Sequence, residues 1–313
     1  MTSCAKGSST AEATGTLDNS TAAYVGRFAP TPSGPLHLGS LLTAVASYLD
    51  ARANTGEWRL RIDDIDTPRI VPEAETLILR ALEAHGLFWD GPVAHQSAHA
   101  DAYRDAYSEL QSNGRVFHCS CSRRDLRGTT RYPGTCRDKR QPRPGCAGRV
   151  VVDDTLWGFD DLVYGCYNER LSETVGDFVV WRRDDIASYQ LAVVVDDHLQ
   201  GVNHIVRGSD LLDNTARQLQ LIDALALARP RYRHVPIIVD IREVKLSKHD
   251  AASTIDERFP TRNLASVLQL LGQQLPGSGI EAMSAEDLVT AAASTWERSR
   301  IPKSLSVAGY YAI

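Results

Sequence analysis

The stretch that decides the fold is GRFAPTPSGPLHLGS, residues 26–40, in which three prolines and three glycines lead into an apolar segment. A short strand is predicted over Tyr24–Phe28, and apolar residues recur at helical spacing from Leu38 onward. A strand, a turn and a helix start aim backbone N–H groups and the positive end of the helix dipole at one point, which predicts an anion site. His37 would add a hydrogen bond to a phosphate oxygen there, although a lone histidine more often caps a helix or packs.

The segments beyond this stretch alternate between strand and helix patterns. Glu57–Ile62 has the alternation of a strand, and Ala74–Leu82 has the spacing of a helix. After a long interruption the alternation resumes, with strands predicted over GDFVVWR (residues 176–182), Leu191–Val195 and Val235–Val239, and a helix over residues 211–227. The fold class is therefore α/β, a Rossmann-like parallel sheet split by an insertion, with a short C-terminal helical segment.

These patterns predict five segments along the chain. Residues 1–22 are biased toward Ser, Thr, Ala and Gly and are expected to form a disordered leader. Residues 23–116 and 178–250 form the two halves of the sheet domain, and residues 117–177 form the insertion. Residues 251–313 form the C-terminal helical segment.

Composition limits the class of protein. The chain has 313 residues, of which 43% are hydrophobic and 23% charged, as in soluble globular proteins. No apolar run approaches the roughly 18 residues of a membrane span, and the N-terminus lacks the apolar core of a secretory signal. We therefore expect a cytoplasmic protein with no membrane partner. Because the net charge is −5, a nucleic-acid partner would have to meet a local basic patch.

The insertion carries three cysteines, Cys119, Cys121 and Cys136, within 18 residues. A segment with little core of its own would gain stability from a structural zinc ion, which thiolates bind well. The alternative is that the thiols are free core side chains. Candidates for a fourth ligand include His118, Cys146 and Cys166.

The same insertion contains a basic segment, Arg123–Arg143, with eight cations and two acids in 21 residues. Such a run is often only a solvated loop. Held in place by zinc, it would instead contact nucleic-acid phosphates, and that binding would depend on salt but not on base sequence.

Two short motifs resemble the signatures of class I aminoacyl-tRNA synthetases. PLHLG (residues 35–39) is similar to the first signature, and KLSK (residues 245–248) is similar to the second. Four longer blocks, RFAPTPSG, RIDDID, YQLAVVVDD and HIVRGSDL, resemble blocks of the glutamyl-tRNA synthetases. The resemblance extends over residues 24–250.

This resemblance implies an ATP-dependent activation of glutamate and assigns roles to residues. Catalysis would rest on positioning and on stabilising charge at the phosphates. The catalytic residues implied are His37, Lys245 and Lys248. ATP, with magnesium, would contact His37, Gly39, Ser40 and Lys248. Glutamate would contact Arg27, Phe28, Ala29, Pro30, Thr31, Asp63, Tyr189 and Arg207. One structural zinc ion would be held by Cys119, Cys121, Tyr132 and Cys136.

The length of the chain narrows the resemblance. Only 65 residues follow Lys248, too few for a separate anticodon-binding domain of about 100 residues or more. The chain resembles the shorter glutamyl-Q tRNA(Asp) synthetases. Two residues agree with that family: Ile65, where full-length synthetases usually have Thr, and His249, where they usually have Ser or Arg. That resemblance implies activation of L-glutamate without tRNA and its transfer to queuosine in the anticodon stem-loop of tRNA(Asp). We further expect residues 251–313 to contact an RNA stem and the enzyme to be a monomer. Asp63 departs from the family, which usually has Glu there.

Other readings of the same residues stay open. One is a truncated glutamyl-tRNA synthetase that charges the acceptor end. Another is a non-catalytic, zinc-stabilised RNA-binding paralogue, although such a protein need not keep Lys248, His37, Arg27 and Arg207. A third is an adenylating ligase acting on a small amine, which would not need the basic insertion.

Overall fold

The structure, a computed structural model, describes residues 22–139, 145–239, 255–277 and 279–308. The chain begins with the predicted alternation of strands and helices. The elements are β1 (Val25–Phe28), α1 (Leu38–Arg52), β2 (Glu57–Ile62), α2 (Ala74–Ala84), β3 (Ala94–His95) and α3 (Ala100–Ser112). β1, β2 and β3 form a parallel sheet in which β2 is central. The strand and helix predictions for this half are confirmed.

A second, four-stranded sheet lies beside β1. Its order is β7 (Gly165–Arg170), β6 (Leu156–Asp161), β10 (Arg231–Val235) and β9 (His204–Gly208), and β6, β10 and β9 run parallel. β9 lies beside β1. Just before β9, the backbone N–H of Asn203 donates to the carbonyl of Val25 in β1 at 3.0 Å. The helices of this half are α5 (Tyr189–Leu199) and α6 (Thr215–Ala224). The parallel α/β architecture is therefore as expected.

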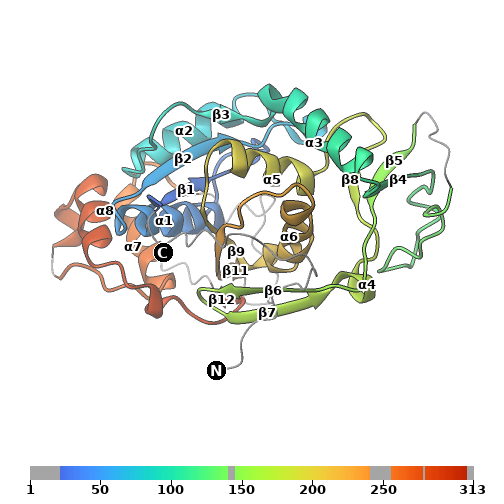
Figure 1. The fold of residues 1–313 in the computed structure, drawn as a ribbon. Coiled ribbons are helices and arrows are strands. Elements are labelled where there is room, and N and C mark those ends of the chain that lie inside the picture. The colour runs from blue at the N-terminus through green and yellow to red at the C-terminus, as the bar shows by residue number, and fades with distance from the viewer. Residues whose placement is uncertain (1–21, 140–144, 240–254, 278, 309–313) are drawn as a thin grey trace.

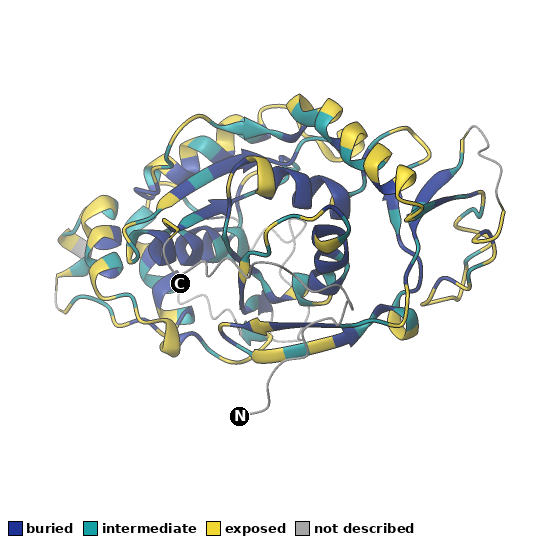
Figure 2. Ribbon diagram, viewed as in Figure 1, coloured by how far each residue is buried: buried dark blue, intermediate teal, exposed yellow. Residues whose placement is uncertain are grey.

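The strand predicted over Leu191–Val195 is wrong, because these residues lie in the middle of α5. Every residue from Gln190 to Asp197 is buried. A helix buried on most of its surface loses the polar face that gives helical spacing its signature, so its apolar run reads like an interior strand. Figure 2 shows how deeply α5 is enclosed.

A small third sheet lies at one end of the molecule. It joins β4 (Val116–Cys119), β5 (Ala147–Val150) and β8 (Val179–Trp181) in antiparallel pairs. GDFVVWR thus does form a strand, β8, but it closes this sheet instead of resuming the parallel one. The β6–β7 hairpin and the short helix α4 (Leu171–Thr174) also fall within the range 117–177, although β6 pairs with β10. The expected domain boundaries remain a prediction.

The C-terminal residues cover the opposite end (Figure 1). α7 (Pro260–Leu270) and α8 (Ala285–Ser294) pack with α1 in one apolar core, and β12 (Ser306–Ala308) pairs in parallel with β11 (Ile237–Val239). The helical character predicted for this segment is confirmed for α7 and α8. Among the described helices, none has both the length and the apolar character needed to span a bilayer.

Candidate active site

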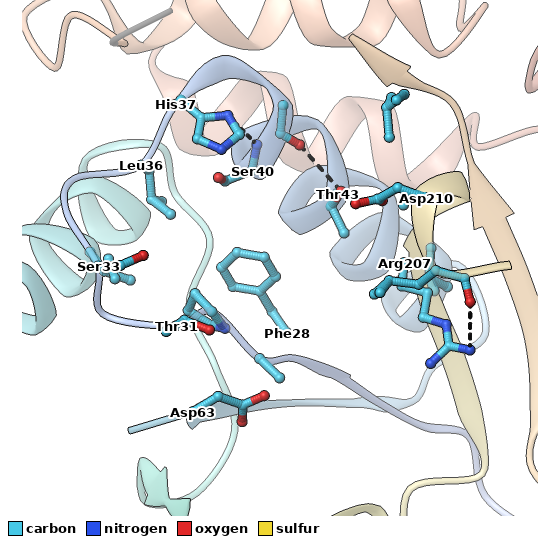
Figure 3. A pocket seen from close by; sticks show the side chains of 18 of the residues that line it. Phe28, Thr31, Ser33, Leu36, His37, Ser40, Thr43, Asp63, Arg207 and Asp210 are labelled. Carbon is cyan, nitrogen blue, oxygen red and sulfur yellow. Dashed lines mark hydrogen bonds between the residues drawn. The ribbon is translucent and has the colours of Figure 1, made fainter. Parts of the chain in front are cut away.

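A cavity of about 480 Å³ opens where β1 and β9 end and α1 begins. Figure 3 shows His37 and Ser40 on one side of it, Asp63 on the other, and Arg207 with Asp210 across from Thr31 and Ser33. The structure brings together eleven of the residues named from the sequence: Arg27, Phe28, Ala29, Pro30, Thr31, His37, Gly39, Ser40, Asp63, Tyr189 and Arg207. Lys245, Lys248 and His249 lie outside the described residues.

The start of α1 forms one wall of this cavity. The Nδ1 atom of His37 accepts a hydrogen bond from the backbone N–H of Ser40 at 3.2 Å, so His37 caps the helix. The His37 side chain therefore both caps α1 and lines the cavity. Because Nδ1 is an acceptor, a neutral His37 carries its proton on Nε2, the nitrogen that would donate to an anion. The helix dipole favours an anion at the same place.

Asp63 lies at the other wall and is tied to a buried arginine. Nε of Arg61 donates to the Asp63 carboxylate at 2.7 Å, and Arg61 is fully buried. Burial raises the pKa of Asp63 to about 6, although the nearby Arg61 charge opposes the shift. Nη2 of Arg61 has no hydrogen-bond partner among the described residues. A cation placed beside Asp63 would stabilise its ionised form.

The charge of Arg27 is balanced by a carboxylate of the protein, Asp197. Its guanidinium pairs with both oxygens of Asp197 at 3.2 and 3.4 Å. Asp197 also accepts from Nη1 of Arg61 at 2.8 Å, so one carboxylate joins both arginines. Burial alone would raise the pKa of Asp197, but the Arg27 and Arg61 charges hold it below its usual value.

Arg207 is held differently. Its Nε donates to Nε2 of His234 at 3.0 Å. Its two terminal nitrogens donate to uncharged oxygens of Gln218 at 2.7 Å, Thr215 at 2.8 Å and Leu211 at 3.3 Å. Only 3% of Arg207 is exposed, and it still lines the cavity. A guanidinium has five N–H donors, so four protein acceptors leave one on Nη1 for a ligand.

Several lining residues were not named from the sequence. They are Ser33, Leu36, Thr43, Arg61, Arg69, Ile78, Val193, Val206, Gly208, Asp210, Leu211, Pro236, Ile237 and Ile238. A signal existed for Arg61, because it stands two residues before Asp63 and residues at that spacing share one face of a strand. About half of the others lie inside the blocks that resemble the synthetases: Ser33, Leu36, Val193, Val206, Gly208, Asp210 and Leu211. No comparable signal marks Thr43, Arg69, Ile78, Pro236, Ile237 and Ile238.

The structure also assembles the expected metal ligands. The sulfur atoms of Cys119, Cys121 and Cys136 lie within 4.8 Å of one another. Sγ of Cys121 and Sγ of Cys136 are 3.6 Å apart, close to the roughly 3.8 Å expected for two thiolates on one tetrahedral zinc ion. The hydroxyl of Tyr132 lies 3.4 Å from Sγ of Cys119 and 3.9 Å from Sγ of Cys121. The three cysteines could therefore hold one metal ion, and the Tyr132 hydroxyl lies beside two of them.

The other candidate ligands do not join this group. Within the described chain, the metal-ligand cluster contains only the three cysteines, without His118, Cys146 or Cys166. The small core around the cluster contains four buried residues: Phe117, Cys119, Tyr132 and Cys136. So little apolar burial around the cysteines is what we expect of an insertion that gains stability from a bound metal ion.

The basic segment is only partly free to meet a partner. Arg137 pairs with Asp177 and also donates to the carbonyl of Val152 at 2.7 Å, so it holds the module together. Arg123, Arg124 and Arg131 are exposed. Arg140 and Arg143 lie outside the described residues.

Comparison with known proteins gives the class. Residues 24–303 match the family described as tRNA synthetases class I (E and Q), catalytic domain. The fold is similar to the crystal structure of glutamate-tRNA synthetase from Elizabethkingia anophelis, with a TM-score of 0.78, 24% identity, and coverage of 92% of this chain and 68% of that one. Fold and site thus define a class I tRNA synthetase catalytic domain, an ATP-using ligase.

Two curated relatives narrow the family. The glutamyl-Q tRNA(Asp) synthetase of Pseudomonas aeruginosa strain PAO1 is 46% identical over 284 residues, which cover 90% of this chain and 97% of that protein. The protein of the same name from Pseudomonas entomophila is 45% identical over 285 residues, 91% of this chain and 96% of its own length. The chain belongs to the family of glutamyl-Q tRNA(Asp) synthetases.

Proposed function

We propose that this enzyme activates L-glutamate with ATP in the absence of tRNA and transfers the glutamyl group to queuosine at the wobble position of tRNA(Asp). The observation that carries the proposal is that relatives named glutamyl-Q tRNA(Asp) synthetase match this chain over 96–97% of their own length. The cavity supports it, because a helix start suited to phosphates and side chains suited to an amino acid line one space.

The chemistry needs no side-chain nucleophile. A carboxylate oxygen of glutamate attacks the α-phosphorus of ATP, the bond to the leaving pyrophosphate breaks, and a glutamyl adenylate forms. A hydroxyl of the queuosine cyclopentenediol then attacks the glutamyl carbonyl, and AMP leaves. The start of α1 and His37 hold the phosphates, and Lys245 and Lys248 neutralise the charge that grows on pyrophosphate. Magnesium would share that charge.

Glutamate presents two carboxylates and one ammonium. Arginine is the natural planar partner of a carboxylate, and Arg27 and Arg207 both line the cavity. Asp63 supplies the negative charge that faces the ammonium. Tyr189, 39% exposed at the start of α5, contacts the substrate from the open side.

A structural zinc ion on Cys119, Cys121, Cys136 and Tyr132 completes the enzyme. Zinc at this position supplies rigidity and not catalysis, since the cavity residues are drawn from other elements. The exposed arginines of the basic segment contact tRNA phosphates, and the anticodon stem-loop reaches the cavity from that side. The ordered module thus presents the RNA to the activated glutamate.

The first test is ATP–pyrophosphate exchange with glutamate and no RNA. The expected result is exchange that depends on glutamate. Exchange only after tRNA is added would instead support an enzyme that charges the acceptor end. No exchange under either condition would overturn catalysis altogether.

The second test locates the ester. tRNA(Asp) with and without queuosine is incubated with radiolabelled glutamate, and the product is digested with nucleases. Periodate treatment before the reaction oxidises the diol of the 3′-terminal ribose and so blocks acceptor charging. The cyclopentenediol of queuosine is protected during this step, so that the modified base can still accept glutamate. Label in the anticodon fragment is expected, and label in the 3′-terminal fragment would contradict the proposal.

A further inference from the structure

The two arginines of the cavity differ in how their charge is balanced. Arg27 has its own carboxylate partner, since Asp197 binds it with both oxygens. Among the described residues, no carboxylate lies at ion-pair distance from Arg207, whose partners are an imidazole, an amide, a hydroxyl and a backbone carbonyl. A buried cation without a counter-ion gains most from an incoming anion. Arg207 is therefore the stronger attractor for a substrate carboxylate.

A buried histidine contacts the Arg207 guanidinium. Nε2 of His234 accepts from Nε of Arg207 at 3.0 Å, and Nδ1 of His234 lies 2.7 Å from Oδ2 of Asp161. The His234 side chain is fully buried and does not line the cavity. It can accept from Arg207 only when Nε2 carries no proton.

Asp161 is fixed at the other end of this chain of contacts. Its Oδ1 accepts from the backbone N–H groups of Val163 and Tyr164 at 2.9 and 3.0 Å, in the turn that follows β6. Its Oδ2 accepts from the backbone N–H of His234 at 3.1 Å. A carboxylate so placed accepts a hydrogen bond from Nδ1–H, so the proton stays on Nδ1 and Nε2 keeps a free lone pair. The tautomer of His234 is therefore set by Asp161.

We propose that His234 and Asp161 form a positioning relay that fixes the Arg207 guanidinium for recognition of a substrate carboxylate. Neither His234 nor Asp161 touches the substrate in this proposal. Their effect reaches Arg207 through the Nε hydrogen bond and through Thr215, whose hydroxyl lies 3.4 Å from Nε2 of His234 and accepts from Arg207. With Nε held by His234, the remaining Nη1 donor stays directed at the cavity. The inference rests on the proposed function, because it takes glutamate as the ligand of Arg207.

A matched pair of variants separates the two bonds of His234. In His234→Gln the amide oxygen reaches the place of Nε2 and can accept from Arg207, but the bond to Asp161 is lost. In His234→Asn the amide reaches the place of Nδ1 and can donate to Asp161, but the bond to Arg207 is lost. Each variant loses one buried hydrogen bond, so a general effect on stability is similar in both.

The measurement is ATP–pyrophosphate exchange with glutamate and ATP varied separately. The expected result is a KM for glutamate raised about tenfold or more in His234→Asn and about threefold or less in His234→Gln. The KM for ATP should stay unchanged in both variants, and kcat should change less than the KM for glutamate. Equal KM values for glutamate in the two variants, or a wild-type value in His234→Asn, would overturn the relay.

A second measurement does not depend on activity or on variants that fold. In protein carrying ¹⁵N-labelled histidine, long-range ¹H–¹⁵N spectra report which ring nitrogen of His234 holds the proton. The relay predicts a proton on Nδ1 and none on Nε2 between pH 6 and 8. A proton on Nε2 would refute the relay even if exchange occurs. Wild-type enzyme with no glutamate-dependent exchange would instead refute the proposed function and leave the tautomer result standing.

Discussion

At the scale of single residues, Asp63 shows how burial and charge compete in this site. The carboxylate is 8% exposed, and its removal from water favours the neutral acid. Arg61 opposes that tendency at 2.7 Å, yet the pKa still stands at about 6. Near neutral pH the group is ionised, and a modest drop in pH neutralises it. In the proposed function Asp63 faces the ammonium of glutamate, so the affinity for glutamate should depend on pH around 6, above the pKa of about 4.3 of the glutamate side chain.

We expect the dissociation constant for glutamate to rise as the pH falls below about 6. The ammonium of glutamate prefers ionised Asp63, so affinity is full above the pKa of about 6 and is lost below it. At pH 5 about a tenth of the molecules are ionised, which predicts a dissociation constant about tenfold higher than at pH 8. Isothermal titration calorimetry between pH 5 and 8 measures it directly, without the titration of ATP.

Asp63→Asn is the control for that prediction. The amide matches the carboxylate in size but has no charge, so binding should be weaker at pH 8 and nearly constant down to pH 5. If Asp63→Asn kept the pH dependence of the wild type, another group would have to be responsible.

The residues that the sequence could identify are those that lie in a recognisable motif. His37 follows directly from a strand–turn–helix start, and Asp63 follows from the resemblance of RIDDID to a block of the glutamyl-tRNA synthetases. His234 and Asp161 act through a contact between distant segments, with 73 residues separating them. Hydrophobic spacing carries no information about such pairs.

At the scale of elements, the cysteine cluster beside the small sheet has little apolar core of its own. Four buried residues form its core, and two of them are cysteines of the cluster. We expect Cys136→Ser to lose bound zinc and Cys146→Ser to keep it, because Cys146 lies outside the cluster. Zinc per chain, measured by plasma mass spectrometry after dialysis, checks this. Retention of zinc by Cys136→Ser would contradict the predicted ligand set.

The same metal group allows a test of the fourth ligand. Tyr132→Phe removes only the hydroxyl that lies near Cys119 and Cys121. The variant should still bind zinc through three thiolates but lose it at a lower concentration of chelator than the wild type does. An unchanged chelator titration would exclude Tyr132 as a ligand.

The basic segment should act on RNA and not on activation. Arg127→Glu with Arg131→Glu replaces two positive charges in the module, whose residues do not line the cavity. We expect weaker transfer of glutamate to tRNA, a reduced salt dependence of binding, and unchanged exchange without RNA. Arg80→Glu with Arg104→Glu makes the same change in charge at exposed positions on α2 and α3. Equal loss of transfer and exchange in the first pair would contradict the assignment.

Element type was predictable where apolar residues kept the spacing of their element. α1 and α2 kept helical spacing, and β2 kept its alternation. α5 did not, since Leu191–Val195 is apolar on all sides in a helix that the rest of the molecule encloses. The partner of a strand was also beyond reach, as β8 shows by pairing with β5 instead of a parallel neighbour.

At the scale of the whole molecule, one buried carboxylate joins the sheet domain to the C-terminal segment. Asp50, at the end of α1, is fully buried. It accepts from the Tyr24 hydroxyl at 2.6 Å, from Nε of Arg298 at 2.7 Å and from Nε1 of Trp296 at 3.0 Å, and it pairs with the buried Arg233. Burial alone would raise the pKa of Asp50, but Arg233, Tyr24 and Arg298 hold it below its usual value.

We expect Asp50→Asn to lower the free energy of unfolding by about 3–5 kcal/mol, because it leaves Arg233 buried without its counter-ion. Urea denaturation at pH 7 measures the loss. Asp101→Asn is the control, since the Asp101 side chain is fully exposed and its substitution should change stability by less than about 0.5 kcal/mol.

The pKa of Asp50 is lower in the folded than in the unfolded chain. Its contribution is therefore full above the unfolded value of about 3.9 and declines as the pH falls toward the folded value. The gap between wild type and Asp50→Asn should accordingly narrow in strong acid; a gap that stayed constant there would mean that packing, and not charge, fixes the C-terminal segment.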